Sequence, residues 1–277
     1  MLLVFITQHT AMFRLLLAIF STTCAVVAAW SSTGHMIVAT IGANSIMNPE
    51  TLTRLNRILQ QPTGVQCQTP PTLDVVDAAP WMDDIKHCTH EYDAWHYVDA
   101  EVDAPFTLSA SPNVVTAIQE AMTAPNQSFN LHVLTHLVGD IHQPLHCANR
   151  NNDRGGNDFV LNGHHNLHSL WDTGLGMFSH DLPRPLSSAH ADYLQGWADK
   201  VQTQYPANES PMKERLQKTN IEDWARESHD IARDHVYVGI FPHTTPEKRY
   251  LEENEAIVHQ QLAVAGYRLA DLLIRWR

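Results

Sequence analysis

Apolar residues recur at the three-and-four spacing of a helix face along most of the chain. Asn48-Pro49 and Ser111-Pro112 resemble helix starts with proline at the first helical position, and Pro144 should stop the helix that begins near residue 128. The pattern predicts helices over 34–47, 51–60, 112–123, 128–142, 189–204, 220–239 and 247–276.

One segment favours strands instead. Residues 158–161 (DFVL) precede Asn162-Gly163, a dipeptide typical of two-residue hairpin turns, and a short histidine-bearing stretch follows. No internal repeat, low-complexity tract or dividing linker interrupts the pattern. The expected fold class is therefore all-α: a single mainly helical domain, residues 30–277, with a small β-hairpin excursion.

The first 29 residues form a different kind of sequence. They contain the apolar run LLLAIFSTTCAVV, Arg14 as their only charged residue, and the small-residue cleavage pattern Val27-Ala28-Ala29. These features predict a signal peptide over 1–29 and a mature chain that starts at Trp30. An uncleaved membrane anchor is the alternative, although the run is shorter than the ~20 residues of a spanning helix. We expect the secretory pathway, with a secreted or lumenal product that has no transmembrane anchor.

Composition narrows the possible partners. The formal net charge is -12, with 18 histidines and only five lysines. Such a surface repels nucleic acid backbones unless something positive intervenes locally, and bound divalent cations would serve.

Three cysteines remain after the signal peptide. Cys67 and Cys88 bracket a loop rich in proline and threonine, and we expect them to form a disulfide. Cys147 is left as a buried inert thiol, with a minor metal role open because it adjoins His146. Asn126-Gln127-Ser128 and Asn208-Glu209-Ser210 match the N-glycosylation acceptor pattern.

Histidines and carboxylates cluster in the segment HLVGDIHQPLH, residues 136–146. His136 and Asp140 stand four residues apart, on one helical face, and His168 and Asp172 repeat this spacing. Imidazole and carboxylate without thiolate favour zinc or another divalent ion in a hydrolytic site. A buried polar network without metal is the alternative.

Several ordered motifs together resemble one enzyme family. The motifs are Trp30 with His35, WMDDIK at 81–86, WHYVD at 95–99, HLVGDIHQPLH at 136–146, GGND at 155–158 and NLHSLWD at 166–172. In these the chain resembles the class I nucleases, the secreted zinc-dependent single-strand-specific nucleases of fungi and plants, together with the protozoan 3′-nucleotidase/nucleases. The resemblance also implies the fold of the zinc phospholipase C and class I nuclease group.

The resemblance implies a site for three zinc ions. The first would be held by Asp83, His96, His136 and Asp140. The second would be held by His35, Asp140 and the backbone amine and carbonyl of Trp30, so that Asp140 bridges the pair. The third would be held by His146, His168 and Asp172. The amine of Trp30 becomes a ligand only after the signal peptide is removed.

The resemblance also implies how substrate is handled. Asp83 would bind zinc and orient the attacking water, while Lys86, where the family usually has arginine, would offset charge in the transition state. Tyr97 corresponds to the residue that stacks a base, Asp99 to the carboxylate that bonds its edge, and Asn157 is a further substrate contact. Asp140, Asp83 and Lys86 are thus the expected catalytic residues.

The expected substrates are single-stranded RNA and DNA, cut to 5′-nucleotides, and 3′-nucleotides, which lose their 3′-phosphate. We expect a monomer with no stable protein partner. A zinc phospholipase C acting on a lipid phosphodiester and a non-catalytic zinc-binding protein are the alternatives. His132, one turn before His136, has no ligand counterpart in the family, and we expect it to be structural.

Overall fold

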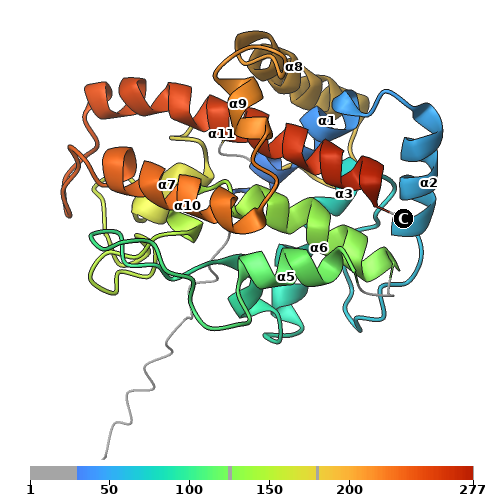
Figure 1. Cartoon of the computed structure of the whole chain (residues 1–277), viewed down its shortest axis with the longest axis horizontal. Coiled ribbons are helices and arrows are strands. Elements are labelled where there is room, and N and C mark those ends of the chain that lie inside the picture. Colours follow the sequence, from blue (N-terminus) through green and yellow to red (C-terminus); the bar gives the residue numbers. More distant parts are fainter. Residues whose placement is uncertain (1–29, 124–126, 179–180, 277) are drawn as a thin grey trace, which may run out of the picture.

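The computed structural model describes residues 30–123, 127–178 and 181–276. The predicted signal peptide and the acceptor Asn126 lie outside the described residues. The architecture is mainly helical, as expected (Figure 1). The longer helices are α1 (Ser32–Ser45), α2 (Pro49–Leu59), α5 (Val114–Ala121), α6 (Gln127–Asp140), α8 (Ser188–Gln204), α10 (Ile221–Ile231) and α11 (Lys248–Arg275). The short ones are α3 (Val75–Ala78), α4 (Trp81–Asp84), η1 (Ile85–His87), η2 (Asp93–His96), η3 (Pro144–His146), α7 (Leu167–Asp172), α9 (Met212–Leu216) and the π-helical η4 (Ala232–Val236).

Helix α11 spans most of the molecule's length, with α8 on one side and α5 and α6 on the other (Figure 1). It packs tightly along α1: a Cβ added to Gly266 would lie 2.3 Å from Ile41 Cγ2, and one added to Gly42 would lie 3.3 Å from Leu269. Glycines at the crossing therefore allow the two backbones to approach. This contact holds the C-terminal half of α1 against α11, and the first turn of α1 carries His35.

Helix α6 is buried on almost every face. Its Leu131, Leu134 and Leu137 are fully buried apolar residues, yet Thr135, His136 and Asp140 are also fully buried. Burying an unpaired charge or imidazole costs free energy unless a partner compensates it. The buried polar residues of α6 therefore indicate that polar side chains from other elements must contact them, and this makes their surroundings the candidate functional site.

Two expected helix starts had different outcomes. Asn48 caps α2 by accepting a hydrogen bond from the Glu50 amide at 2.8 Å, with Pro49 at the first position, which confirms that prediction. The start at Ser111-Pro112 is wrong, because α5 is capped by Asn113, which accepts from the Thr116 amide at 3.1 Å. The Thr116 hydroxyl accepts from the Asn113 amide at 3.0 Å in return, and the two bonds form a capping box, a stronger stabilisation than proline alone.

The expected hairpin is reduced to one isolated antiparallel bridge between Leu161 and His164, and the described residues contain no named strand. The Asn162 amide instead donates to the Thr244 carbonyl at 2.9 Å. Contact with this distant loop replaces the ladder that a hairpin would need. The expected helix 128–142 ends at Asp140, four residues before Pro144, which begins η3.

The predicted disulfide between Cys67 and Cys88 is present. It ties the loop after α2 to the segment that follows α4. None of the helices in 30–123, 127–178 and 181–276 combines the length and apolarity needed to cross a bilayer. The second glycosylation acceptor, Asn208, is exposed.

Candidate metal centre

Four side chains from three elements meet beneath the surface: Asp83 from α4, His96 from η2, and His136 and Asp140 from α6. We call these residues the Asp140 group. Asp140 Oδ2 lies 2.7 Å from His96 Nδ1 and 3.3 Å from His136 Nε2. Asp83 Oδ1 lies 3.7 Å from His136 Nε2 and 4.0 Å from His96 Nδ1. Donor atoms on separate elements therefore converge on one centre.

His35 approaches the same carboxylate from α1. Its Nε2 lies 3.2 Å from Asp140 Oδ1, the oxygen that faces away from His96 and His136, and its ring stacks on that of His136 at 3.9 Å between centroids. Gly139 makes room for it, since a Cβ there would lie 2.6 Å from His35 Nδ1. The two oxygens of Asp140 thus face different sets of donors.

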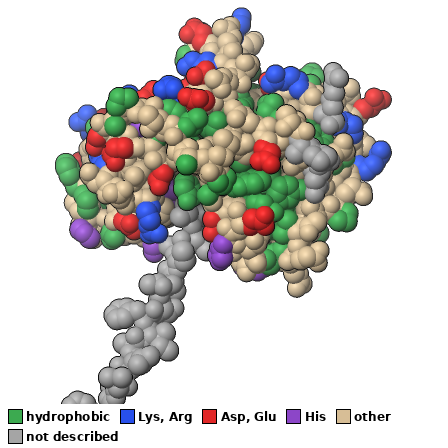
Figure 2. Space-filling view, turned by 60° about the horizontal axis from the view of Figure 1, so that its bottom comes forward, with side chains coloured by type: hydrophobic (Ala, Val, Ile, Leu, Met, Phe, Trp, Pro, Cys, Tyr) green, Lys and Arg blue, Asp and Glu red, His purple; other side chains and the backbone are tan. Residues whose placement is uncertain are grey.

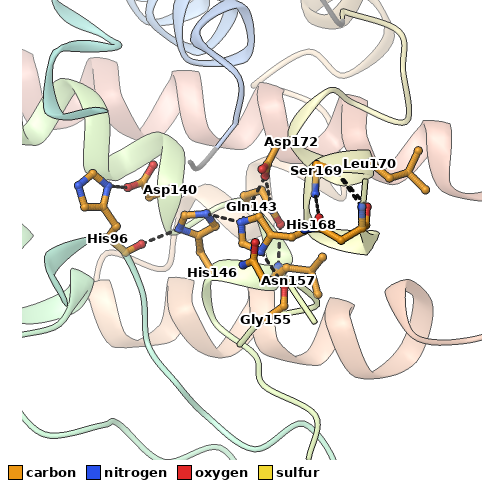
Figure 3. Close-up of polar contacts among 12 residues, drawn as sticks. His96, Asp140, Gln143, His146, Gly155, Asn157, His168, Ser169, Leu170 and Asp172 are labelled. Carbon is orange, nitrogen blue, oxygen red and sulfur yellow. Dashed lines mark hydrogen bonds and ion pairs between the residues drawn. The ribbon is translucent and has the colours of Figure 1, made fainter. Parts of the chain in front are cut away.

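A second cluster, which we call the His146 group, consists of His146, His168 and Asp172 (Figure 3). The Nε2 atoms of His146 and His168 are 3.1 Å apart, and His168 Nε2 lies 3.5 Å from Asp172 Oδ1. Asn166 caps the short helix α7, accepting from the Ser169 amide at 2.7 Å, and so fixes the turn that carries His168 and Asp172. The repeated four-residue spacing does place imidazole and carboxylate on one face.

Backbone carbonyls orient three of these imidazoles. The Nδ1 atoms of His136, His146 and His168 donate to the carbonyls of Ala79, His96 and Gly155 at 2.7, 2.7 and 2.6 Å. A proton on Nδ1 leaves the lone pair on Nε2, which points into the group. Metal-binding histidines are held in this way in proteins. One of the acceptors, the His96 carbonyl, belongs to a residue of the other group.

Several buried polar atoms of these residues have no hydrogen-bond partner: both ring nitrogens of His35, Nε2 of His96 and Oδ1 of Asp140. Buried groups of this kind are rare and costly in folded proteins. A cation between His35 and Asp140 would satisfy the facing pair. The donor set of imidazoles and carboxylates without thiolate suits zinc, so the residues fit the implied ions.

Burial decides the protonation of the imidazoles. It lowers the pKa of His35 and of His96 to about 4, so both rings are neutral at pH 7 and can offer a lone pair. For His136 burial is outweighed by the nearby carboxylates, which raise its pKa. Burial also raises the pKa of Asp172 well above its usual range. A carboxyl in that situation ionises readily only beside a cation.

Trp30 is fully buried at the start of the described chain. The next amide, that of Ser31, donates to the Asp172 carbonyl at 2.8 Å. A Cβ on Gly34 would lie 2.8 Å from Trp30 Cβ, so α1 begins directly against this residue. The backbone of the first described residues therefore lies next to the His146 group.

The expected catalytic and substrate residues surround these groups. Lys86 Nζ donates to Asp83 Oδ1 at 2.6 Å. Val98, between Tyr97 and Asp99, donates its amide to the His146 carbonyl at 2.7 Å, which places both neighbours at the edge of the groups.

Tyr97 is half-buried and Asp99 is exposed. Asn157, half-buried, lies beside His168 in Figure 3, and its Nδ2 donates to the Arg154 carbonyl at 2.8 Å. These residues thus adjoin the segments that carry the buried donors.

Sequence reasoning missed Gln143. Its amide donates to Asp172 Oδ1 at 2.7 Å and fixes that carboxylate. His132 does not join the metal groups, and its ring lies between Trp81, Ser128 and Thr72. Cys147 is buried and bonds the Ile141 carbonyl at 3.6 Å, and burial raises its pKa, as for an inert thiol.

The sequence of this chain matches known proteins over most of its length. The model of the S1/P1 nuclease family matches residues 30–276. Endonuclease 5 of Arabidopsis thaliana is 26% identical over 278 residues, which cover 89% of this chain and 90% of the relative. Nuclease S1 of Aspergillus oryzae is 24% identical over 279 residues, 88% of this chain and 90% of its own length. Nuclease P1 of Penicillium citrinum is 26% identical over 193 residues, 61% and 64% of the two chains.

Proposed function

Because this chain belongs to the S1/P1 nuclease family, we propose that it is a zinc-dependent phosphoesterase acting on single-stranded RNA and DNA and on 3′-nucleotides. Its products would be 5′-nucleotides from the polymers, and nucleosides with free phosphate from 3′-nucleotides. The observation that carries this proposal is the arrangement of buried donors around Asp140, with one oxygen toward His96 and His136 and the other toward His35.

The proposed ligand sets are those that the family resemblance implies, and the closeness of the donor atoms supports them. Asp140 would bridge two zinc ions, one with Asp83, His96 and His136, the other with His35 and the terminal amine and carbonyl of Trp30. The third ion would be held by the His146 group. When bound, zinc supplies a Lewis acid and a nucleophile at neutral pH.

Asp83 and Lys86 form the proposed catalytic pair. The 2.6 Å contact from Lys86 Nζ fixes the carboxylate of Asp83, which would orient the attacking water. Lys86 is almost buried, and an ammonium in such surroundings stabilises developing phosphoryl charge more strongly than in water. Compared with the family's arginine, lysine keeps the charge and loses the two-pronged contact.

Substrate attraction would come from the ions rather than from a basic groove. On the face in Figure 2, Lys and Arg side chains are scattered between Asp and Glu side chains. Tyr97 would stack a base and Asp99 would accept hydrogen bonds from its edge, both of which require an unpaired strand. Asn157 would contact the same nucleotide.

Processing and export belong to the same proposal. Removal of residues 1–29 would create the α-amine of Trp30, and the product would be a secreted or lumenal monomer, with Asn208 open to glycosylation. The proposal predicts that zinc loading depends on the cleavage.

Zinc content measured beside hydrolysis of 3′-AMP, RNA and single-stranded DNA tests the function. We expect about three ions per chain and turnover on all three substrates. Zinc added back after chelation should restore hydrolysis. Restored zinc without turnover would assign a binding protein, and release of phosphocholine from a lipid instead would assign a phospholipase.

A further inference from the structure

A cavity lies next to the segments that carry the metal groups, in the described part of the chain. It has a volume of about 450 Å³, opens to the surface, and is lined by the end of α2, the loop of residues 60–72, Trp81 at the start of α4 and His132 on α6. The proposed reaction does not use this cavity. We call it the loop cavity.

The lining of the loop cavity mixes polar and apolar side chains and carries no charged carboxylate, ammonium or guanidinium. None of its 15 lining residues is Asp, Glu, Lys or Arg. Glutamine amides and threonine hydroxyls, such as those of Gln60, Gln66 and Thr69, line it together with the rings of Trp81 and His132. Such a lining offers donors, acceptors and apolar surface, with two aromatic rings that are almost buried in its wall, but nothing to neutralise a phosphate. It suits a neutral, flat ring with polar edges, which describes a nucleobase.

The wall of the loop cavity is held in place at several points. Ser128 Oγ donates to the Gln61 carbonyl at 2.7 Å, and Gln60 Nε2 donates to the Leu73 carbonyl at 2.7 Å. Thr72 Oγ1 lies 3.1 Å from His132 Nε2. The Cys67–Cys88 disulfide attaches the middle of the loop to the segment after α4. These contacts form the cavity before any ligand arrives, which reduces the ordering cost of binding.

The loop cavity also adjoins the residues of the Asp140 group. Trp81 precedes Asp83 by two residues, and His132 precedes His136 by one helical turn, about 6 Å along the axis of α6. Cys67, on the cavity wall, lies 3.5 Å from the exposed ring of His87, which directly follows Lys86. The helices that carry Asp83 and His136 thus also contribute to the wall of the loop cavity.

We propose that the loop cavity binds a base of the single-stranded substrate, separate from the base at Tyr97 and Asp99. This inference rests on the proposed function. It assigns the cavity to polymers, because a 3′-mononucleotide has only one base. The cavity would thus favour oligonucleotides over mononucleotides.

Steady-state kinetics of zinc-loaded variants test the assignment. Thr69→Trp fills the cavity, Gln66→Ala removes an exposed polar contact, and Gln68→Ala changes an exposed neighbour in the same loop that does not line the cavity. We expect Thr69→Trp to raise KM for a single-stranded oligonucleotide about tenfold, with Gln66→Ala raising it less. KM and kcat for 3′-AMP should stay unchanged in both, and Gln68→Ala should match wild type on both substrates.

Two kinetic results would overturn the assignment. One is an unchanged oligonucleotide KM in both cavity variants, and the other is a parallel loss on 3′-AMP and on the oligonucleotide. If the wild-type protein hydrolyses neither substrate, the proposed function fails, and the cavity is then judged by binding alone. Equilibrium binding of a phosphorothioate oligonucleotide should weaken in Thr69→Trp and not in Gln68→Ala. Competition by N-acetylglucosamine and not by adenosine would assign the cavity to a sugar instead.

Discussion

Replacement of Gly139 by alanine tests the proposed metal centre without replacing any of the proposed ligands. The added Cβ would lie 2.6 Å from His35 Nδ1 and 2.9 Å from its Cε1. An ordinary contact begins near 3.4 Å, so the ring must retreat by about 0.8 Å, the difference from 2.6 Å. Metal–ligand distances tolerate only about 0.2 Å. Misplacement of a reacting group by about 1 Å can cost about 100-fold in rate.

We therefore expect Gly139→Ala to bind less zinc and to lose about 100-fold in kcat/KM on 3′-AMP. The protein should remain folded, because alanine is the better helix former by about 1 kcal/mol, which offsets part of the local strain. Gly196→Ala on α8 is the matched control, since no atom lies within 4 Å of its added Cβ. Elemental analysis, kinetics and thermal unfolding give the three readouts. Full zinc content with wild-type kcat/KM in a folded Gly139→Ala protein would refute the role of His35.

Three further predictions concern Asp140, the N-terminal amine and His132. Asp140→Ala should abolish hydrolysis of RNA and single-stranded DNA and remove more than one zinc ion per chain, and near-normal turnover would exclude a bridging carboxylate. A protein made with one extra methionine before Trp30 should contain less zinc than one that starts at Trp30, whereas equal content would exclude the terminal amine as a ligand. The pKa of His132, lowered by burial to about 4, makes stability pH-dependent. Between pH 6.5 and 4 the unfolded chain takes up a proton that the folded chain does not, so the free energy of unfolding should fall with falling pH, by up to about 3 kcal/mol from this residue. Urea titrations of the chelated protein should show a smaller fall for His132→Gln, and an identical fall would contradict this account.

The long helices were predictable because each buries a face whose spacing is visible in the sequence. The error at Ser111-Pro112 arose because Asn113, one residue later, satisfies the free amides of α5 better than proline does. Four-residue elements such as α3 and α4 carry no periodicity of their own. Asp74 caps the start of α3, while the Ala79 carbonyl at its end accepts a hydrogen bond from the distant His136.

A spacing of four identified His136 with Asp140 and His168 with Asp172 as candidate ligands, and the family resemblance supplied the others. The residues that hold these ligands in place could not be identified from the sequence. Gln143 contributes an amide, and Gly139 contributes only the absence of a side chain, so neither suggests metal chemistry in the sequence. Their roles appear only when the residues they contact are known. The hairpin failed for a related reason, since Asn162 found its backbone partner in a loop more than 80 residues away.

The hydrogen bond from His146 to the carbonyl of His96 connects the Asp140 group directly to the His146 group. A ring that shifts in one group moves the peptide that aligns a ring in the other. Ion uptake should consequently be cooperative, and a chelator should remove all the ions from one molecule before partly depleted molecules accumulate. A half-stripped sample would then be a mixture of fully active and inert chains, and its residual activity would count molecules rather than measure a weakened enzyme.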